Sequence, residues 1–226
     1  MKIDHVFFDL DHTLWDFEKN SALAIETIFK KHAIDVDLQL FLSYYVPINI
    51  KYWEWYRVDK ISQFELRLGR LKETFHLVDY EIDDEKILFL SEEYIEYLPK
   101  FNFLFEGAIE ILDYLKPKYN LHIITNGFQE IQDNKLKNSN IAHYFKTITN
   151  SELAGVKKPN PVIFQYAITE ANASKTNSIM IGDCIDADVN GALNFGMDAI
   201  LFNIDPSKSY ENITQIAHLL ELKNHL

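Results

Sequence analysis

The chain has 226 residues, of which 47% are hydrophobic and 25% charged, enough for one domain with a small insertion around a sizeable core. This composition excludes collagen-like, disordered and disulfide-rich proteins, and a net charge of −12 argues against a nucleic-acid polymer as partner. The one cysteine, Cys184, cannot form an internal disulfide, and the chain shows neither a signal peptide nor a long uninterrupted apolar run. We therefore expect a cytoplasmic protein that does not contact a membrane.

The first expected element is a short strand at Val6–Phe8, an apolar run typical of a strand buried on both faces of a parallel sheet. A tight turn follows it, and we expect Asp16 to cap the next helix through its side chain. From Asn20 to Leu98 the apolar residues recur at helical spacing, and no strand interrupts them. This pattern predicts an all-helical insertion after the first strand.

Beyond Pro99 the pattern changes to alternating helices and strands. We expect helices at 108–116, 129–138, 161–171 and 187–195, strands at 121–125, 147–149, 178–181 and 199–202, and a last amphipathic helix at 210–222. Right-handed crossovers would place the strands in one parallel sheet with helices on both faces. The predicted fold is α/β, with a Rossmann-like three-layer core (residues 1–16 and 99–226) and a helical insertion (residues 17–98).

Two carboxylates, Asp9 and Asp11, directly follow the first strand, at the carboxyl edge of the predicted sheet. That edge is where open α/β sheets bind ligands, and two acids placed there require a compensating cation. Magnesium prefers hard oxygen ligands and is commonly bound together with a phosphate group. The pair therefore predicts a magnesium site for a small phosphorylated ligand.

The segment Asp9-Leu10-Asp11-His12-Thr13-Leu14 resembles the DxDxT signature of the haloacid dehalogenase-like (HAD) phosphohydrolases. Three further motifs of that family occur in the expected order: Thr125-Asn126-Gly127, Lys158-Pro159, and Gly182-Asp183 followed by Asp188. The resemblance implies that the helical insertion is a cap that closes over an active site. It also implies a magnesium-dependent phosphomonoesterase that forms an aspartyl-phosphate.

The resemblance assigns a role to each motif residue. Asp9 is expected to be the nucleophile, Asp11 the acid and base, and Lys158 the group that balances charge. Phosphate binding falls to Thr125, Asn126 and Gly127, and the expected magnesium ligands are Asp9, Asp11, Asp183 and Asp188.

All three arginines of the chain, Arg57, Arg67 and Arg70, lie within the predicted cap together with Lys60. We expect Arg57 and Lys60, on a turn between two cap helices, to contact the substrate; surface salt bridges with nearby glutamates would account for them equally well. Residues 9–21, 124–145 and 158–164 resemble the pyrimidine 5'-nucleotidase-like branch of the family. The expected substrate is therefore a nucleoside 5'-monophosphate, hydrolysed by a monomer or homodimer.

Three other functions fit parts of the same pattern. A phosphatase or mutase for a sugar phosphate or another small ester would share the chemistry and differ in the cap. A 2-haloacid dehalogenase would use the same nucleophile, but it needs neither Asp11 nor magnesium. A phosphate-binding protein without catalytic activity would be expected if Asp9 or Lys158 were missing, and both are present.

Overall fold

The computed structural model describes residues 2–226 and divides into two compact units. One unit comprises the chain up to Phe17 together with Asn102–Leu226, and the other comprises Glu18–Phe101. The strands are β1 (His5–Phe8), β2 (Asn120–Thr125), β3 (Phe145–Asn150), β4 (Ser178–Gly182), β5 (Asp198–Phe202) and β6 (Gln215–Ile216). The α-helices are α1 (Phe17–Lys31), α2 (Leu38–Arg57), α3 (Gln63–Leu77), α4 (Asp84–Tyr97), α5 (Ala108–Leu115), α6 (Gln129–Asn138), α7 (Ser151–Ala154), α8 (Pro161–Glu170) and α9 (Gly191–Phe195).

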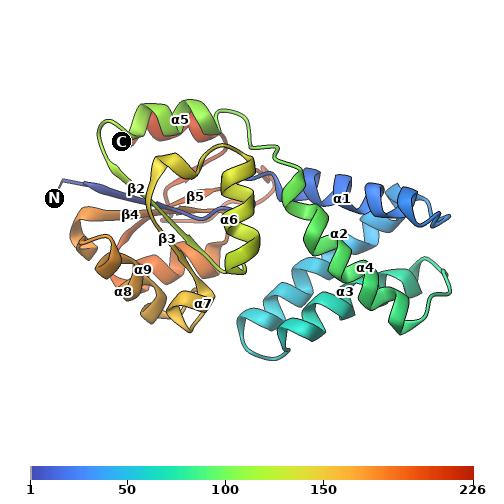
Figure 1. Cartoon of the computed structure of the whole chain (residues 1–226). Coiled ribbons are helices and arrows are strands. Elements are labelled where there is room, and N and C mark those ends of the chain that lie inside the picture. Colours follow the sequence, from blue (N-terminus) through green and yellow to red (C-terminus); the bar gives the residue numbers. More distant parts are fainter. Residues whose placement is uncertain (1) are drawn as a thin grey trace. The chain divides into compact units, whose positions relative to one another are not determined.

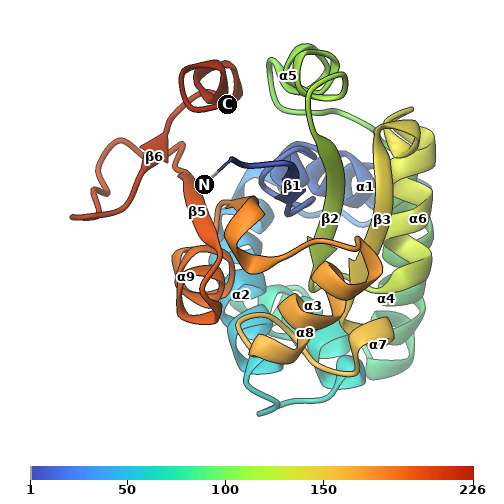
Figure 2. The ribbon, with the colours of Figure 1, turned by 90° about the vertical axis from the view of Figure 1, so that its left-hand side faces the viewer.

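The larger unit is built on a six-stranded sheet with the order β3-β2-β1-β4-β5-β6, and every neighbouring pair is parallel. Figure 2 shows β6 and β3 at opposite sides of the sheet. The first strand lies between β2 and β4, with Phe8 opposite Ile123 on one side and Ile181 on the other. Residues that follow β1, β2 and β4 therefore meet at one edge.

Helices cover both faces of this sheet, with α5 on one side and α8 and α9 on the other (Figure 1). The α8 and α9 side is a core of buried side chains in which Phe7 and Met180 from the strands pack with Phe164 and Phe195 from the helices. On the α5 side, α5 packs with the 3-10 helix Leu219–Asn224. The predicted α/β fold with a parallel sheet is confirmed.

The predicted helix at 210–222 is wrong. Asn212 has a left-handed φ of 61°, and the chain after it forms strand β6 before a 3-10 helix at Leu219–Asn224. The amides of Leu201 and Asn203 donate to the carbonyls of Thr214 and Ile216, at 2.9 and 2.8 Å. The edge of β5 thus offers free backbone donors and acceptors. A neighbouring strand can pair with these groups, whereas a helix cannot.

The smaller unit is all-helical, as the apolar spacing predicted. Its core contains the rings of Phe29, Phe41 and Phe75, whose centroids lie 4.8 to 5.8 Å apart. Three of its helices begin at side-chain caps, and Ser62 and Glu65 form a complete capping box at the start of α3. The chain between Arg57 and that box is the turn expected from the sequence.

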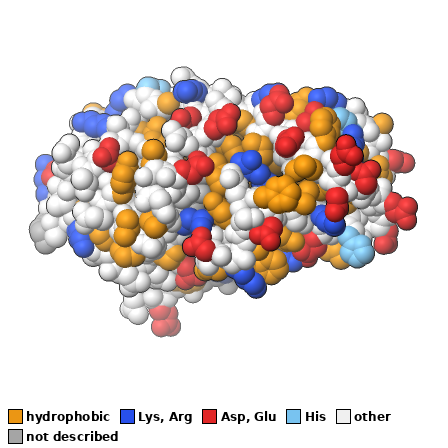
Figure 3. Space-filling view, turned by 60° about the horizontal axis from the view of Figure 1, so that its bottom comes forward, with side chains coloured by type: hydrophobic (Ala, Val, Ile, Leu, Met, Phe, Trp, Pro, Cys, Tyr) orange, Lys and Arg blue, Asp and Glu red, His pale blue; other side chains and the backbone are white. Residues whose placement is uncertain are grey.

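The surface is mixed in charge on the face that Figure 3 shows, where lysine and arginine side chains are scattered among acidic ones. Among residues 2–226, no helix has the length and apolar character needed to cross a membrane.

Candidate active site

The turn after β1 places Asp9 and Asp11 at the carboxyl edge of the sheet. The amide of Asp9 still donates to the carbonyl of Ile181, at 2.9 Å, so the sheet fixes the backbone at this residue. The chain then folds back, with the amides of Leu14 and Trp15 donating to the carbonyl of Leu10. His12 has a φ of 60°, a left-handed conformation that glycine adopts more easily than histidine does.

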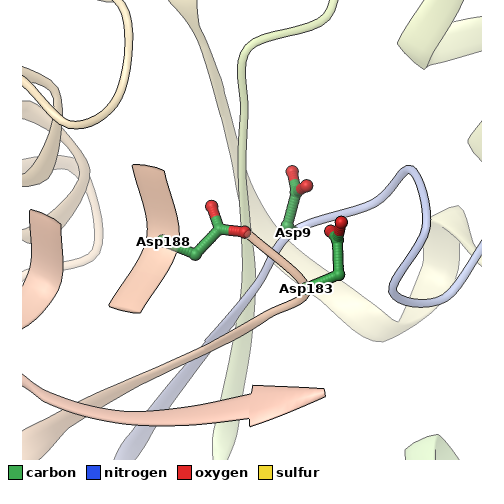
Figure 4. A group of neighbouring side chains, drawn as sticks. All are labelled: Asp9, Asp183 and Asp188. Carbon is green, nitrogen blue, oxygen red and sulfur yellow. The ribbon is translucent and has the colours of Figure 1, made fainter. Parts of the chain in front are cut away.

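Three carboxylates converge at this edge, those of Asp9, Asp183 and Asp188. One oxygen of each lies within 4.8 Å of the others, and Figure 4 shows that they come from the ends of β1 and β4 and from the helical turn after β4. Burial raises the pKa of Asp9 to about 7, and Asp188 and Asp183 add to the shift while Lys158 opposes it. Burial likewise raises the pKa of Asp183 to about 7, with Asp188 adding to it.

Lys158 balances part of this negative charge. Its ammonium, on a side chain that is 1% exposed, donates to Asp188 Oδ1 at 2.6 Å and to the Ile124 carbonyl at 2.7 Å, and it lies 2.9 Å from Asp9 Oδ1. Burial disfavours the charged ammonium, but the carboxylates of Asp188 and Asp9 outweigh it and raise the pKa of Lys158 above its ordinary value. The lysine therefore stays protonated and fixes Asp188 beside Asp9.

Asn126 holds the backbone of Lys158 from both sides. Its Oδ1 accepts from the Lys158 amide at 2.7 Å, and its Nδ2 donates to the Lys158 carbonyl at 3.0 Å. The sequence predicted that Asn126 binds phosphate, and this stays a prediction; its side-chain amide contacts the backbone of Lys158. Its contribution here is to position Lys158.

Thr125 and Gly127 lie at the end of β2, and both contact Gln132 of α6. The Thr125 hydroxyl accepts from the Gly127 amide at 3.1 Å and from Gln132 Nε2 at 2.7 Å. A Cβ on Gly127 would lie 2.2 Å from that same Nε2. The glycine is thus required to leave room for Gln132, a reason that the sequence did not reveal.

Asp11 is not one of the three clustered carboxylates; the sequence predicted that it binds the metal with them, and that stays a prediction. Its Oδ1 accepts from Lys135 Nζ at 2.5 Å, and its Oδ2 accepts from Gln132 Nε2 at 2.9 Å. Neither donor belongs to a sequence motif. The signal for them was their spacing, since residues three apart on α6 share one helix face at the end of β2.

Arg57 and Lys60 belong to the smaller unit. Lys60 is exposed and its ammonium lies 4.6 Å from the Trp55 ring centroid, while Arg57, the last residue of α2, is half-buried. Arg70 is buried, donates to Asn49 Oδ1 at 2.8 Å and lies over the Tyr94 ring. Arg70 is therefore an internal residue of this unit.

The donor set fits a divalent cation. Oδ1 of Asp9 is buried and accepts no hydrogen bond within the described chain, because Lys158 faces it without hydrogen-bond geometry. The three clustered carboxylates, Asp9, Asp183 and Asp188, face one buried lysine, Lys158, so two negative charges are uncompensated when all three are ionised. A single magnesium ion would balance them, and oxygen ligands of this kind are those it prefers.

The arrangement agrees with what comparison with known proteins shows. The family pattern of the haloacid dehalogenase-like hydrolases matches residues 3–196. The chain belongs to this family. It is a HAD hydrolase, and Asp9, Asp183 and Asp188 all lie within the matched residues.

Named relatives of this HAD hydrolase include pyrimidine 5'-nucleotidases. The chain is 33% identical to the pyrimidine 5'-nucleotidase PynA of Streptococcus pneumoniae, over 97% of its own length and 91% of the relative. It is 28% identical to the pyrimidine 5'-nucleotidase YjjG of Escherichia coli, over 94% and 92%. Among solved structures, the magnesium-bound HAD-hydrolase YfnB of Bacillus subtilis superposes with a TM-score of 0.90 at 28% identity, covering 100% of this chain and 99% of that one.

Proposed function

We propose that this HAD hydrolase is a magnesium-dependent phosphomonoesterase that acts on nucleoside 5'-monophosphates through an aspartyl-phosphate. The observation that carries the proposal is the buried oxygen of Asp9, which accepts no hydrogen bond and faces the Lys158 ammonium. A carboxylate held in this way at the carboxyl edge of a parallel sheet is placed for nucleophilic attack on phosphorus. The relatives PynA and YjjG support the substrate class.

The proposed reaction has two steps. In the first, Asp9 attacks phosphorus, the bond to the leaving oxygen breaks, and Asp11 gives its proton to that oxygen. In the second, Asp11 takes a proton from water as the water oxygen attacks phosphorus and releases Asp9. The Thr125 hydroxyl and the Lys158 ammonium bind and neutralise the phosphoryl oxygens, which reduces the charge that repels the nucleophile.

Asp9 and Asp183 would hold the magnesium ion, with Asp188 nearby and fixed by Lys158. When bound, the ion supplies positive charge that orients the phosphoryl group and stabilises charge in the transition state. Thr13 donates to Asp183 Oδ1 at 3.2 Å and so fixes the orientation of this carboxylate.

The all-helical unit is proposed to act as the cap, and Arg57 and Lys60 to contribute to the choice of leaving group. Fold alone does not determine a substrate, so this part of the proposal depends on the family branch and on the chemistry of the side chains. A contact to a charged group is worth about 1.5 to 3 kcal/mol, or roughly ten- to a hundredfold in kcat/KM.

Phosphate release from purified protein tests the proposal. The panel contains pyrimidine and purine nucleoside monophosphates, sugar phosphates and p-nitrophenyl phosphate, each measured with magnesium and with a chelator. We expect turnover with magnesium only and the highest kcat/KM for a nucleotide. A preference for sugar phosphates would overturn the substrate class, and full activity after thorough chelation would overturn the metal dependence.

Replacing Arg57 and Lys60 by alanine tests the cap residues separately. We expect kcat/KM to fall for nucleotides much more than for p-nitrophenyl phosphate, because the latter has no nucleoside to contact. Equal losses for both substrates would mean that the turn only supports the cap.

A further inference from the structure

We infer that Lys135 and Gln132 of α6 are positioning residues that hold Asp11 in place for proton transfer to the leaving group. The inference rests on the proposed function, since it concerns the acid of that reaction. It adds two residues that lie outside the four sequence motifs, on a helix that those motifs do not include.

The two donors hold the Asp11 carboxylate from both sides. Lys135 donates to Oδ1 at 2.5 Å and Gln132 donates to Oδ2 at 2.9 Å, so rotation of the carboxyl group would break at least one hydrogen bond. The side chain of Asp11 itself is 20% exposed, and the lysine side chain is only 2% exposed. A partly exposed acid is thus fixed by buried groups.

Lys135 is itself held by aromatic rings. Its ammonium lies 4.3 Å from the ring centroid of Trp15 and 5.3 Å from that of Phe17, two residues of the segment that follows the Asp11 turn. A buried ammonium is stable only when it is paired, and attraction to ring faces adds to the pairing with Asp11. These contacts give the lysine little freedom to leave the acid.

Gln132 also connects the acid to the phosphate-binding segment. Its Nε2 donates both to Asp11 Oδ2 and to the Thr125 hydroxyl, at 2.9 and 2.7 Å. The side chain of Gln132 is 1% exposed, and the missing Cβ of Gly127 provides the space it occupies. One amide group therefore fixes the spacing between the group that protonates the leaving oxygen and a group proposed to bind the phosphoryl oxygens.

General acid catalysis requires the acid to lie within hydrogen-bond reach of the leaving oxygen, and it contributes typically 10²- to 10⁴-fold. A misplaced acid therefore costs most when the leaving group is strongly basic. If Lys135 and Gln132 only supported the fold, good and poor leaving groups would be affected equally.

The test compares phenyl phosphate with p-nitrophenyl phosphate, which have similar shapes but leaving groups of different basicity. The variants are Lys135→Met, Lys135→Arg and Gln132→Met, and the control is Lys137→Met, which removes an exposed lysine from the same helix. Thermal unfolding of each variant, with magnesium present, shows whether it is folded.

For Lys135→Met we expect kcat/KM to fall at least roughly tenfold more with phenyl phosphate than with p-nitrophenyl phosphate. Lys135→Arg should recover part of this difference because it keeps a cationic donor, and Lys137→Met should match the wild type. If Lys135→Met does not fold, Gln132→Met decides on the same ratio. Equal losses for the two esters in the folded variants would overturn the inference, whereas a wild type inactive on nucleotides, sugar phosphates and aryl esters alike would overturn the proposed function itself.

Discussion

Magnesium binding to this protein should release protons, and its apparent affinity should fall steeply below neutral pH. The two acids proposed to hold the ion, Asp9 and Asp183, have pKa values raised to about 7, mainly by burial. Magnesium binds the ionised carboxylates, so it competes with protons for both groups. An exposed aspartate, with an ordinary pKa near 3.9, would show no such competition between pH 6 and 8.

The size of the effect follows from these values. At pH 6 a carboxyl group with a pKa of about 7 is ionised in roughly one molecule in ten, which weakens the apparent affinity about tenfold. If the pair releases one proton, the dissociation constant at pH 6 should be about tenfold higher than at pH 8; if it releases two, the ratio approaches about a hundredfold. The two groups are neighbours, so they titrate as a pair.

Calorimetric titration with magnesium, repeated in buffers of different ionisation enthalpy, measures the number of protons released. We expect between one and two at pH 6 and fewer than one at pH 8, with a lower number for Asp183→Asn at pH 6. The raised pKa values also mean that the metal-free protein loses stability as the pH rises through about 7, so magnesium should raise the Tm more at pH 8 than at pH 6. An affinity that stays constant from pH 6 to 8, without proton release, would refute this account of the site.

Three further predictions concern single residues. Asp9→Asn should abolish turnover of every phosphate ester while preserving the circular dichroism spectrum, because the amide keeps the shape of the acid but is a poor nucleophile; retained activity would exclude the aspartyl-phosphate. Gly127→Ala should displace Gln132 and reproduce the selective loss with phenyl phosphate expected of Gln132→Met, and kinetics like the wild type would show that Gln132 can move at little cost. His122 lies against His5 in the sheet. Burial, with His5 and Lys146, lowers the pKa of His122 to about 3. The free energy of unfolding should therefore fall by about 2 kcal/mol as the pH is lowered from 7 to 5. Denaturant unfolding of His122→Gln should show a weaker dependence on pH in that range, and an unchanged dependence would assign the loss to other groups.

The parts of the fold that the sequence predicted are those set by local pattern and by sheet geometry. The apolar run at Val6–Phe8 indicated a strand buried on both faces, and the structure places β1 in the middle of the sheet. The structure pairs β1 with β4, so Asp183 lies beside Asp9, since the carboxyl ends of neighbouring parallel strands meet. The local sequence pattern was sufficient for the motifs at Asp9, Thr125 and Asp183, because each lies at or directly after the end of its strand.

The remaining features depend on contacts between distant segments. The clamp on Asp11 joins residues more than a hundred positions apart, and a lysine on α6 has no local feature that separates it from a surface lysine. The hydrogen bonds between the Asn126 side chain and the backbone of Lys158, 32 positions away, likewise have no local signal in the sequence. Strand β6 was missed because the hydrogen bonds that favour it are offered by β5 and not by its own sequence.

The central position of β1 also constrains the order of assembly during synthesis on the ribosome. Its hydrogen-bonding partners are β2, which begins at Asn120, and β4, which ends at Gly182, so the first strand emerges long before either neighbour exists. The helical unit Glu18–Phe101 is a compact unit by itself, and all of its residues are synthesised before β2. The entropic cost of closing the loops between β1 and its partners β2 and β4 therefore arises late in synthesis, when those partners become available. Until then the three apolar residues of β1 stay unpaired next to two acids, whose charges keep this segment soluble.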